Sequence, residues 1–264
     1  MNPDIIHKLE AAYALHMQGA HEKAKTGYLD VLKTDKNNVH ALNLLGMLYV
    51  NSDRPDQAKY YLEMAVAAQP NDAQTQNNLG LALKGTGTFK PAAEAFSRAI
   101  KLEPGNPTYR NNLGSVHSDR FQWDAAIPCF IEALKILPDY PECLGNLSHA
   151  FNQVNRSMDA IAAARRAIAL QPDFAKAHYY LADALMKHCA YDEAITHYDK
   201  AYELDTDFLD ALINKSIAQK DAGHLSASEE ALQQTMTKAP DYARSYYVYG
   251  LLMEQLGHIK VGLV

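Results

Sequence analysis

The sequence predicts an all-α solenoid of tandem 34-residue helix-turn-helix units, and three observations carry this prediction. Proline recurs with this period, at Pro70, Pro104, Pro138 and Pro172, with Pro240 two periods beyond the last. The letters NNLG occur at residues 77–80 and again at 111–114. Apolar residues within each period are spaced three and four apart, as in amphipathic helices. A fixed period of this length is typical of repeat architectures.

The period divides the chain into units that share one register. The units are 5–38, 39–72, 73–106, 107–140, 141–174, 175–208 and 209–242, followed by a partial unit at 243–264. Leu79 and Leu83 mark the apolar stripe of a first helix, and Ala92 and Phe96 mark that of a second. One helical hairpin cannot bury its own apolar face, but stacked hairpins share a continuous core. We therefore expect residues 1–264 to form a single solenoid.

Small residues recur where the two helices of a unit would cross. The eighth position of each unit holds alanine, glycine or serine, and so does the twentieth. A glycine inside a helix, such as Gly80 or Gly114, costs about 0.5–1 kcal/mol relative to alanine, so its recurrence indicates close packing. Gly87, Gly223 and Gly257 at the fifteenth position predict the turn between the helices. Proline at the thirty-second position ends the second helix.

The order of these residues resembles the tetratricopeptide repeat (TPR). One unit has Leu79, Gly80, Ala92, Phe96, Ala99 and Pro104, and the next has Leu113, Gly114, Ala126, Phe130, Ala133 and Pro138. The resemblance covers nearly the whole chain without insertion. It implies a right-handed superhelical solenoid with a concave and a convex surface.

Two units depart from this pattern. Unit 5–38 has Ala11 and Ala12 in place of the Leu-Gly pair, and unit 209–242 has Lys215 at its seventh position. Terminal repeats of solenoids are often atypical because one face meets water. The sequence stops within the last unit and would leave four apolar residues without a covering helix, namely Ile259, Val261, Leu263 and Val264. We therefore expect a fragment of a longer protein.

Composition and charge exclude several classes of partner. With 48% hydrophobic residues the chain can bury a core, and its net charge of −6 with scattered lysines and arginines is unlike that of nucleic-acid or anionic-membrane binders. The sequence has no secretory leader and no apolar run of membrane-spanning length. Three cysteines without CxxC spacing indicate neither a disulfide framework nor a zinc site. We expect a cytoplasmic protein.

Motifs for catalysis and cofactor binding are missing from the sequence. It has no GxxxxGK phosphate-binding loop, no GxGxxG dinucleotide motif and no GxSxG nucleophile elbow. Its 11 histidines form no HxxxH pair and occupy different repeat positions. We expect no enzymatic activity, no cofactor and no metal.

A column of asparagines lies on the helix face that the core does not use. In TPR proteins the second, fifth, sixth, ninth, twelfth and thirteenth positions face the concave surface. The sixth position holds four asparagines, Asn78, Asn112, Asn146 and Asn214, interrupted by Tyr180, and the fifth adds Asn43, Asn77 and Asn111. A carboxamide both donates and accepts hydrogen bonds, so this column predicts a ladder that grips the main chain of an extended peptide.

The column resembles the asparagine ladder in the repeat superhelix of O-linked N-acetylglucosamine transferases, and it is similar to grooves in kinesin light chains. The resemblance applies only to Asn78, Asn112, Asn146 and Asn214. A second interpretation stays open, because asparagine is favoured at the sixth position of TPRs in general, where it can bond a neighbouring repeat or water.

The remaining groove positions are polar in the middle and apolar at both ends. The apolar residues are Leu9, Tyr13, Met17, Leu44, Met47 and Val50 at one end, and Tyr179, Tyr180, Ile213, Ile217, Tyr247 and Leu251 at the other. Large apolar side chains that face a cavity mark anchors for a partner. The predicted peptide-binding residues are Asn43, Asn77, Asn78, Asn111, Asn112, Asn146, His149, Tyr179, Tyr180, Asn214 and Tyr247.

These observations favour a domain that binds a protein or peptide in its concave groove. Two alternatives stay open. In one, the chain is the substrate-recognition arm of a larger enzyme, a glycosyltransferase or sulfotransferase, whose catalytic domain follows Val264. In the other, it is a homo-oligomeric scaffold, joined through an apolar end of the groove.

Overall fold

The computed structural model describes residues 3–257, and the chain divides into two compact units between Leu137 and Pro138. We call these parts unit 1 (Met1–Leu137) and unit 2 (Pro138–Val264); each contains several of the 34-residue repeats. The residues expected to lack a covering helix, from Ile259 onward, lie outside the described part of the chain. The single domain expected from the repeat pattern stays a prediction.

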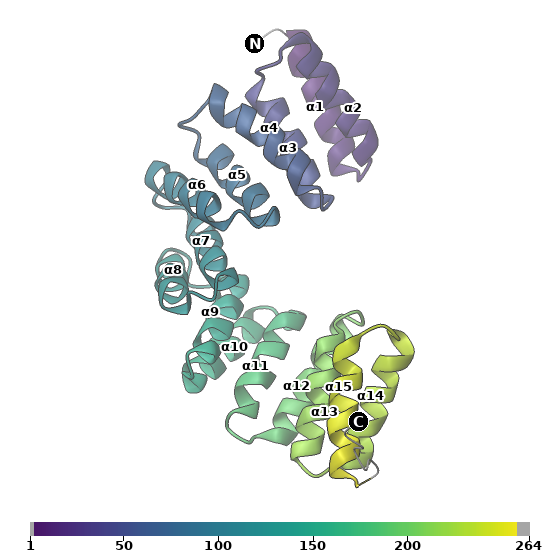
Figure 1. Cartoon of the computed structure of the whole chain (residues 1–264). Coiled ribbons are helices and arrows are strands. Elements are labelled where there is room, and N and C mark those ends of the chain that lie inside the picture. The colour runs from purple at the N-terminus through teal and green to yellow at the C-terminus, as the bar shows by residue number, and fades with distance from the viewer. Residues whose placement is uncertain (1–2, 258–264) are drawn as a thin grey trace. The chain divides into compact units, whose positions relative to one another are not determined.

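Within residues 3–257 the protein consists of fifteen α-helices and no strand (Figure 1). Unit 1 contains α1 (Pro3–Met17), α2 (His21–Thr34), α3 (Val39–Asn51), α4 (Pro55–Ala68), α5 (Ala73–Gly85), α6 (Phe89–Leu102), α7 (Pro107–Asp119) and α8 (Trp123–Ile136). Unit 2 contains α9 (Pro141–Gln153), α10 (Ser157–Leu170), α11 (Ala175–Met186), α12 (Tyr191–Leu204), α13 (Leu209–Asp221), α14 (Leu225–Lys238) and α15 (Ala243–Gln255). The predicted all-α fold with two helices per repeat is confirmed.

The recurring prolines end the second helices as predicted. Helices α4, α6, α8, α10 and α14 each stop two residues before a proline of the series. In unit 1, the first helix of the following repeat then begins with a polar capping residue. The side chains of Asn38, Asp72 and Asn106 accept hydrogen bonds from main-chain N–H groups in the first turns of α3, α5 and α7. Such caps satisfy N–H groups that have no partner within the helix.

The glycines at the eighth position permit the close helix crossing that the sequence predicts. A Cβ atom at Gly80 would lie 2.7 Å from the ring of Phe96, and one at Gly114 would lie 2.6 Å from the ring of Phe130. Both phenylalanines are fully buried. In unit 2 the same position carries Ser148, whose hydroxyl donates to the main-chain oxygen of Ala160 at 2.8 Å. Serine therefore replaces a ring contact with a hydrogen bond.

The fifteenth position of every described hairpin adopts the left-handed conformation. Glycine occupies it in three hairpins, at Gly19, Gly87 and Gly223, and Asp53, Phe121, Asn155 and Cys189 occupy it in the others, with φ between 54° and 59°. The predicted turn is thus present even where glycine is not. Phe121 is the least suited of these residues, because a left-handed conformation costs a bulky side chain about 1–2 kcal/mol.

Candidate functional site

A seam of side chains joins neighbouring first helices within each unit. The fifth position of one repeat meets the sixth position of the next, 35 residues later. Asn78 donates to Asn43 at 3.3 Å and Asn112 donates to Asn77 at 2.8 Å, both in unit 1. In unit 2, Asn214 donates to the hydroxyl of Tyr179 at 2.8 Å. The positions predicted to bind a peptide are therefore also the positions that link one repeat to the next.

The seam in unit 1 is a network of carboxamides, which we call the amide network. It comprises Asn43, Gln74, Thr75, Asn77, Asn78 and Asn112. Gln74 Nε2 and Asn77 Nδ2 both donate to Asn78 Oδ1, at 2.7 and 3.3 Å, and Asn43 Nδ2 donates to Thr75 Oγ1. Asn78 thus uses both its donor and its acceptor atoms on other side chains. Helices α3, α5 and α7 are held together by this network.

Three predicted groove residues of unit 1 are not open to a ligand. Asn77, Asn78 and Asn111 are only 4%, 3% and 1% exposed. The expectation that they line an open surface needs correction, because adjacent first helices pack closely enough to cover them. Asn43 and Asn112 are partly exposed. For Asn78 and Asn112, bonding to a neighbouring repeat is the interpretation that the contacts support.

The seam is apolar near both ends of the described chain. Leu9 and Leu44 both pack against the core cluster of the first repeats, and Ile213 and Val248 belong to one cluster in unit 2. Ile213 was expected in the groove, but it is fully buried. Tyr247 also holds the fifth position of its repeat and is 68% exposed. It lies on α15, the first helix of the repeat that begins at residue 243. Tyr13, Met17 and Leu251, at ninth and thirteenth positions, are exposed as predicted.

In unit 2 the seam is built around a carboxylate. We call Tyr179, Asp183, Tyr198 and Asn214 the tyrosine–carboxylate cluster. Tyr198 Oη donates to Asp183 Oδ1 at 2.6 Å, and Asn214 Nδ2 donates to the same oxygen at 3.0 Å. The ring of Tyr179 lies 4.6 Å from that of Phe208, measured between centroids. Helices α11, α12 and α13 meet in this cluster.

Asp183 is not paired directly with a cation, although the positive charge of the nearby Arg244 lowers its pKa. Burial raises the pKa of this carboxyl to about 6, although the hydrogen bonds from Tyr198 and Asn214 act in the opposite direction. In residues 3–257 Asp183 has no ion pair. The nearby Arg244 pairs instead with Asp210, and its other nitrogen donates to Asn214 Oδ1 at 2.6 Å. A carboxyl with this pKa is largely ionised at pH 7.

An aromatic pair adjoins Tyr179. The imidazole of His149 lies 4.9 Å from the ring of Tyr180, and Tyr180 lies 5.9 Å from Tyr179, both measured between centroids. Burial lowers the pKa of His149, so its ring is neutral at pH 7. Both residues are partly exposed, as is Asn146 on the same helix as His149. At Tyr180, which interrupts the asparagine column, an aromatic ring in contact with His149 and Tyr179 thus takes the place of an amide.

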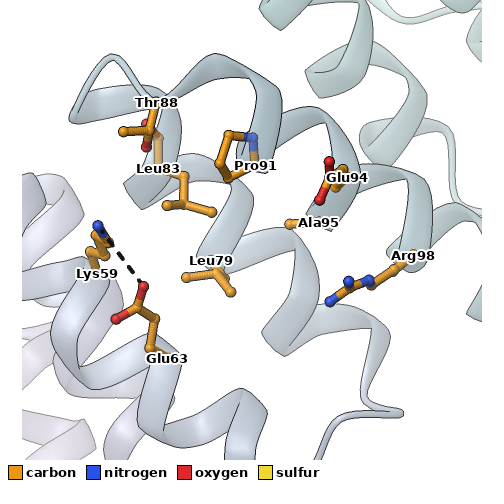
Figure 2. A pocket seen from close by; sticks show the side chains of 9 residues that line it. All are labelled: Lys59, Glu63, Leu79, Leu83, Thr88, Pro91, Glu94, Ala95 and Arg98. Carbon is orange, nitrogen blue, oxygen red and sulfur yellow. Dashed lines mark hydrogen bonds and ion pairs between the residues drawn. The ribbon is translucent and has the colours of Figure 1, made fainter.

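A separate pocket of about 260 Å³ lies in unit 1 between α4, α5 and α6 (Figure 2). Leu79 and Leu83 form its apolar floor, and the charged side chains of Lys59, Glu63, Glu94 and Arg98 surround it. Lys59 and Glu63 approach each other to 4.0 Å. Because acidic and basic groups are balanced here, the pocket has no charge preference for a ligand.

Residues 3–257 contain no group of three or more histidine, cysteine, aspartate or glutamate side chains placed to hold a metal ion. None of the helices described in that range has the length and apolar character to cross a bilayer.

The sequence did not predict Tyr198 or Arg244 as residues of the site. Tyr198 occupies the aromatic core slot of a second helix, where Phe96 and Phe130 stand in other repeats. Its hydroxyl must be satisfied inside the core, and it reaches Asp183. A tyrosine in this slot together with an aspartate at the ninth position of the same repeat was a signal available in the sequence. Arg244 holds the second position of its repeat, and no residue type recurs at that position along the chain.

Comparisons with known proteins support the repeat fold. Residues 6–220 match the profile of the family described as the cilia and flagella-associated protein 70 C-terminal domain, a TPR family. A search of the curated proteins found no match. TPR folds are in general non-catalytic scaffolds for protein interactions. The match gives no specific support for the likeness to O-linked N-acetylglucosamine transferases.

Solved structures are similar in fold. A chain of the APC/C hetero-tetramer Cut9–Hcn1 has a TM-score of 0.80 at 15% identity, over 92% of this chain and 48% of that one. The chain therefore spans about half of that protein's length. PilF of Pseudomonas aeruginosa has a TM-score of 0.70 at 19% identity, over 84% and 98% of the two chains. YrrB, a TPR protein with an unusual peptide-binding site, has a TM-score of 0.54 at 17% identity, over 71% and 97%.

Proposed function

We propose, from the premise that this chain belongs to the TPR family of the cilia and flagella-associated protein 70 C-terminal domain, that it binds an extended segment of a partner protein. The segment lies along the first helices of unit 2. Its contacts there are His149, Tyr179, Tyr180 and Asn214, with Asn146 alongside. Tyr247 on α15, also in unit 2, is a further contact at a position of the same kind.

One observation carries this proposal. Apart from the buried Tyr198, the tyrosine–carboxylate cluster and the neighbouring His149–Tyr180 pair combine partly exposed aromatic rings, an amide and a carboxylate on first-helix positions. Aromatic side chains supply contact area at a low cost in conformational entropy, and the polar atoms between them can orient a peptide main chain. YrrB shares the fold and has a peptide-binding site, which is an analogy at the level of the fold.

The amide network has a different role in this proposal. Asn77, Asn78 and Asn111 are too deeply buried to touch a ligand, and we assign them to holding the first helices of unit 1 in register. A buried amide that is fully hydrogen-bonded fixes the relative placement of the groups around it. The function therefore rests on unit 2 rather than on a continuous asparagine ladder.

Selection from a randomised peptide library tests the proposal. Dodecamer peptides selected on the wild-type chain are measured by fluorescence anisotropy against the double variant His149→Ala, Tyr180→Ala. We expect the double variant to bind at least tenfold more weakly, because a buried aromatic contact in an interface is worth about 1–2 kcal/mol.

A matched control comes from the second helices. Tyr60 on α4 is an exposed tyrosine outside the first-helix face, so Tyr60→Ala is expected to bind the selected peptides like the wild type. Circular dichroism melts of all variants show whether the fold is retained. Equal affinity of a folded double variant and the wild type would refute the assignment to unit 2, and a library that yields no binders would refute peptide binding.

A further inference from the structure

Asp183 and Asp210 place two carboxylates on the first helices of unit 2. In residues 3–257, Arg244 is the cation that contacts the network formed by these two residues and Asn214. Arg244 forms its ion pair with Asp210, and it acts on Asp183 only through the weaker electrostatic effect that lowers the pKa of this carboxyl. The ring of His149 nearby is neutral because burial lowers its pKa.

Lys187 does not supply the missing positive charge. It directly follows the last residue of α11 and lies four residues beyond Asp183, where an ion pair between the two would be geometrically possible. Its ammonium group instead donates to the main-chain oxygen of Asn152 and, at 3.0 Å, to Asn155 Oδ1. The cation nearest to Asp183 along the sequence is therefore bound to Asn152 and Asn155 instead.

One oxygen of Asp183 is fully engaged and the other is not. The hydrogen bonds from Tyr198 and Asn214 both end on Oδ1. In residues 3–257 no side chain or main-chain group donates to Oδ2. Asp183 holds the ninth position of its repeat and is partly exposed. We infer that Oδ1 fixes the carboxylate and that Oδ2 can accept from a donor outside the chain.

Aromatic side chains adjoin this carboxylate. Tyr179 and Tyr180 precede Asp183 on α11, and Tyr179 Oη and Asp183 Oδ1 share the amide of Asn214 as their donor. Burial raises the pKa of Tyr179 and of Tyr180, so both phenols stay neutral. A carboxylate beside aromatic rings is an environment that favours a cation, through charge pairing and through the negative faces of the rings.

We propose that Asp183, flanked by Tyr179 and Tyr180, binds a lysine or arginine side chain of the partner segment. This inference rests on the proposed function and names the chemistry of the partner. The cation pairs with Asp183 Oδ2, and its aliphatic stem packs against the tyrosine rings. Arg244 plays no direct part, because Asp210 and Asn214 already occupy its guanidinium group.

The energetics of the free chain agree with such a role. The pKa of Asp183 is raised to about 6 because burial removes water from the carboxylate and no direct ion pair replaces that stabilisation. A bound lysine or arginine would lower that pKa. Binding is therefore expected to weaken as the pH falls through about 6, when Asp183 takes up a proton. Burial is the largest influence on this pKa, followed by the hydrogen bonds from Tyr198 and Asn214 and by the charges of Arg244 and Asp210. Tyr179, Tyr180 and, on α9, His149 are the neutral titratable groups nearby.

A double-mutant cycle between the chain and its peptide tests the proposal. The probe is a peptide selected from the randomised library on the wild-type chain, together with its analogues in which each basic residue in turn is changed to glutamine. On the wild type, one such change is expected to weaken binding about tenfold. On Asp183→Asn the same change is expected to weaken binding no more than about twofold.

The control variant is Asp192→Asn, which neutralises an exposed carboxylate in the first turn of α12 and should retain the tenfold effect. Asparagine at residue 183 keeps an oxygen to accept from Tyr198 and Asn214, so the variant is expected to fold. Peptides without any basic residue, or an equal loss on wild type and Asp183→Asn, would overturn the inference while leaving peptide binding intact. Loss of all binding in the library screen would overturn both.

Discussion

The seam between first helices has the same geometry in both units but different chemistry. In unit 1, Asn43, Asn77, Asn78 and Asn112 satisfy one another, and the central two are buried. In unit 2, Tyr179 and Asn214 occupy the equivalent positions, and they surround a carboxylate that lacks a cation. From this difference we propose that the polar residues of unit 1, whose hydrogen bonds are made within the chain, serve structure, and that those of unit 2 serve binding.

The largest expected effect comes from breaking the closed amide network. Asn78→Ala removes the acceptor used by Gln74 and Asn77 and the donor used by Asn43, and it leaves the amide nitrogen of the buried Asn77 without this acceptor. We expect the free energy of unfolding to fall by about 2–4 kcal/mol, measured by urea denaturation. Asn112→Ala loses one bond at a partly exposed site and should cost about 1 kcal/mol. Equal costs for the two variants would argue against a closed network.

The next effect compares one glycine from each unit at the same repeat position. Gly114→Ala places a Cβ 2.6 Å from the buried ring of Phe130, so we expect a loss of about 1–3 kcal/mol in unfolding free energy. Gly250→Ala meets no atom within 4 Å and should stabilise α15 by about 0.5–1 kcal/mol. Thermal unfolding of both variants measures the difference, and a shift of the same sign in both would contradict the packing argument.

Asp183→Asn should stabilise the chain at alkaline pH. Because the pKa of Asp183 is raised from 3.8 to about 6, the folded state binds a proton more readily than the unfolded state, and wild-type stability rises as the pH falls from above 6 towards 4. At pH 8 the variant lacks the buried charge, and we expect a gain on the order of 1–3 kcal/mol in unfolding free energy. The gain should shrink at pH 5. A variant less stable than the wild type at pH 8 would contradict this assignment.

The smallest effect concerns the turns. Phe121 in unit 1 and Asn155 in unit 2 hold the same left-handed position, with φ of 56° and 59°. Phe121→Asn should raise the unfolding free energy by about 0.5–1 kcal/mol, since asparagine tolerates this conformation and the 79% exposed phenyl ring adds little. The reverse change, Asn155→Phe, should lower it. Differential scanning calorimetry on both variants tests the pair, and a stabilising Asn155→Phe would count against it.

Much of the fold could be predicted because the residues that specify it repeat at fixed positions. The prolines located the ends of α4, α6, α8, α10 and α14, and Gly80 and Gly114 located the helix crossings. The turns were predictable in part. Asp53 and Phe121 adopt the same left-handed conformation as Gly87, because the surrounding hairpin imposes it on whatever residue is there.

The candidate site was harder to predict because its residues act across repeats. Periodicity assigns Asn78 to a helix face but does not say how closely the next helix approaches, and that distance decides whether the amide is buried. The raised pKa of Asp183 comes from its burial, and hydrogen bonds from Tyr198 and Asn214 on separate helices oppose it. Such contacts depend on side-chain pairs 15 to 35 residues apart, which a single repeat pattern does not contain.

Nuclear magnetic resonance of the intact chain with a saturating selected peptide tests the central claim most directly. The account predicts that the backbone amides of α11 and α13 and the side-chain amide of Asn214 shift, whereas the side-chain amides of Asn77 and Asn78 stay in place. If the amides of Asn77 and Asn78 shift most and α11 and α13 do not respond, the partner binds the asparagines of unit 1, and the assignment of binding to unit 2 is wrong.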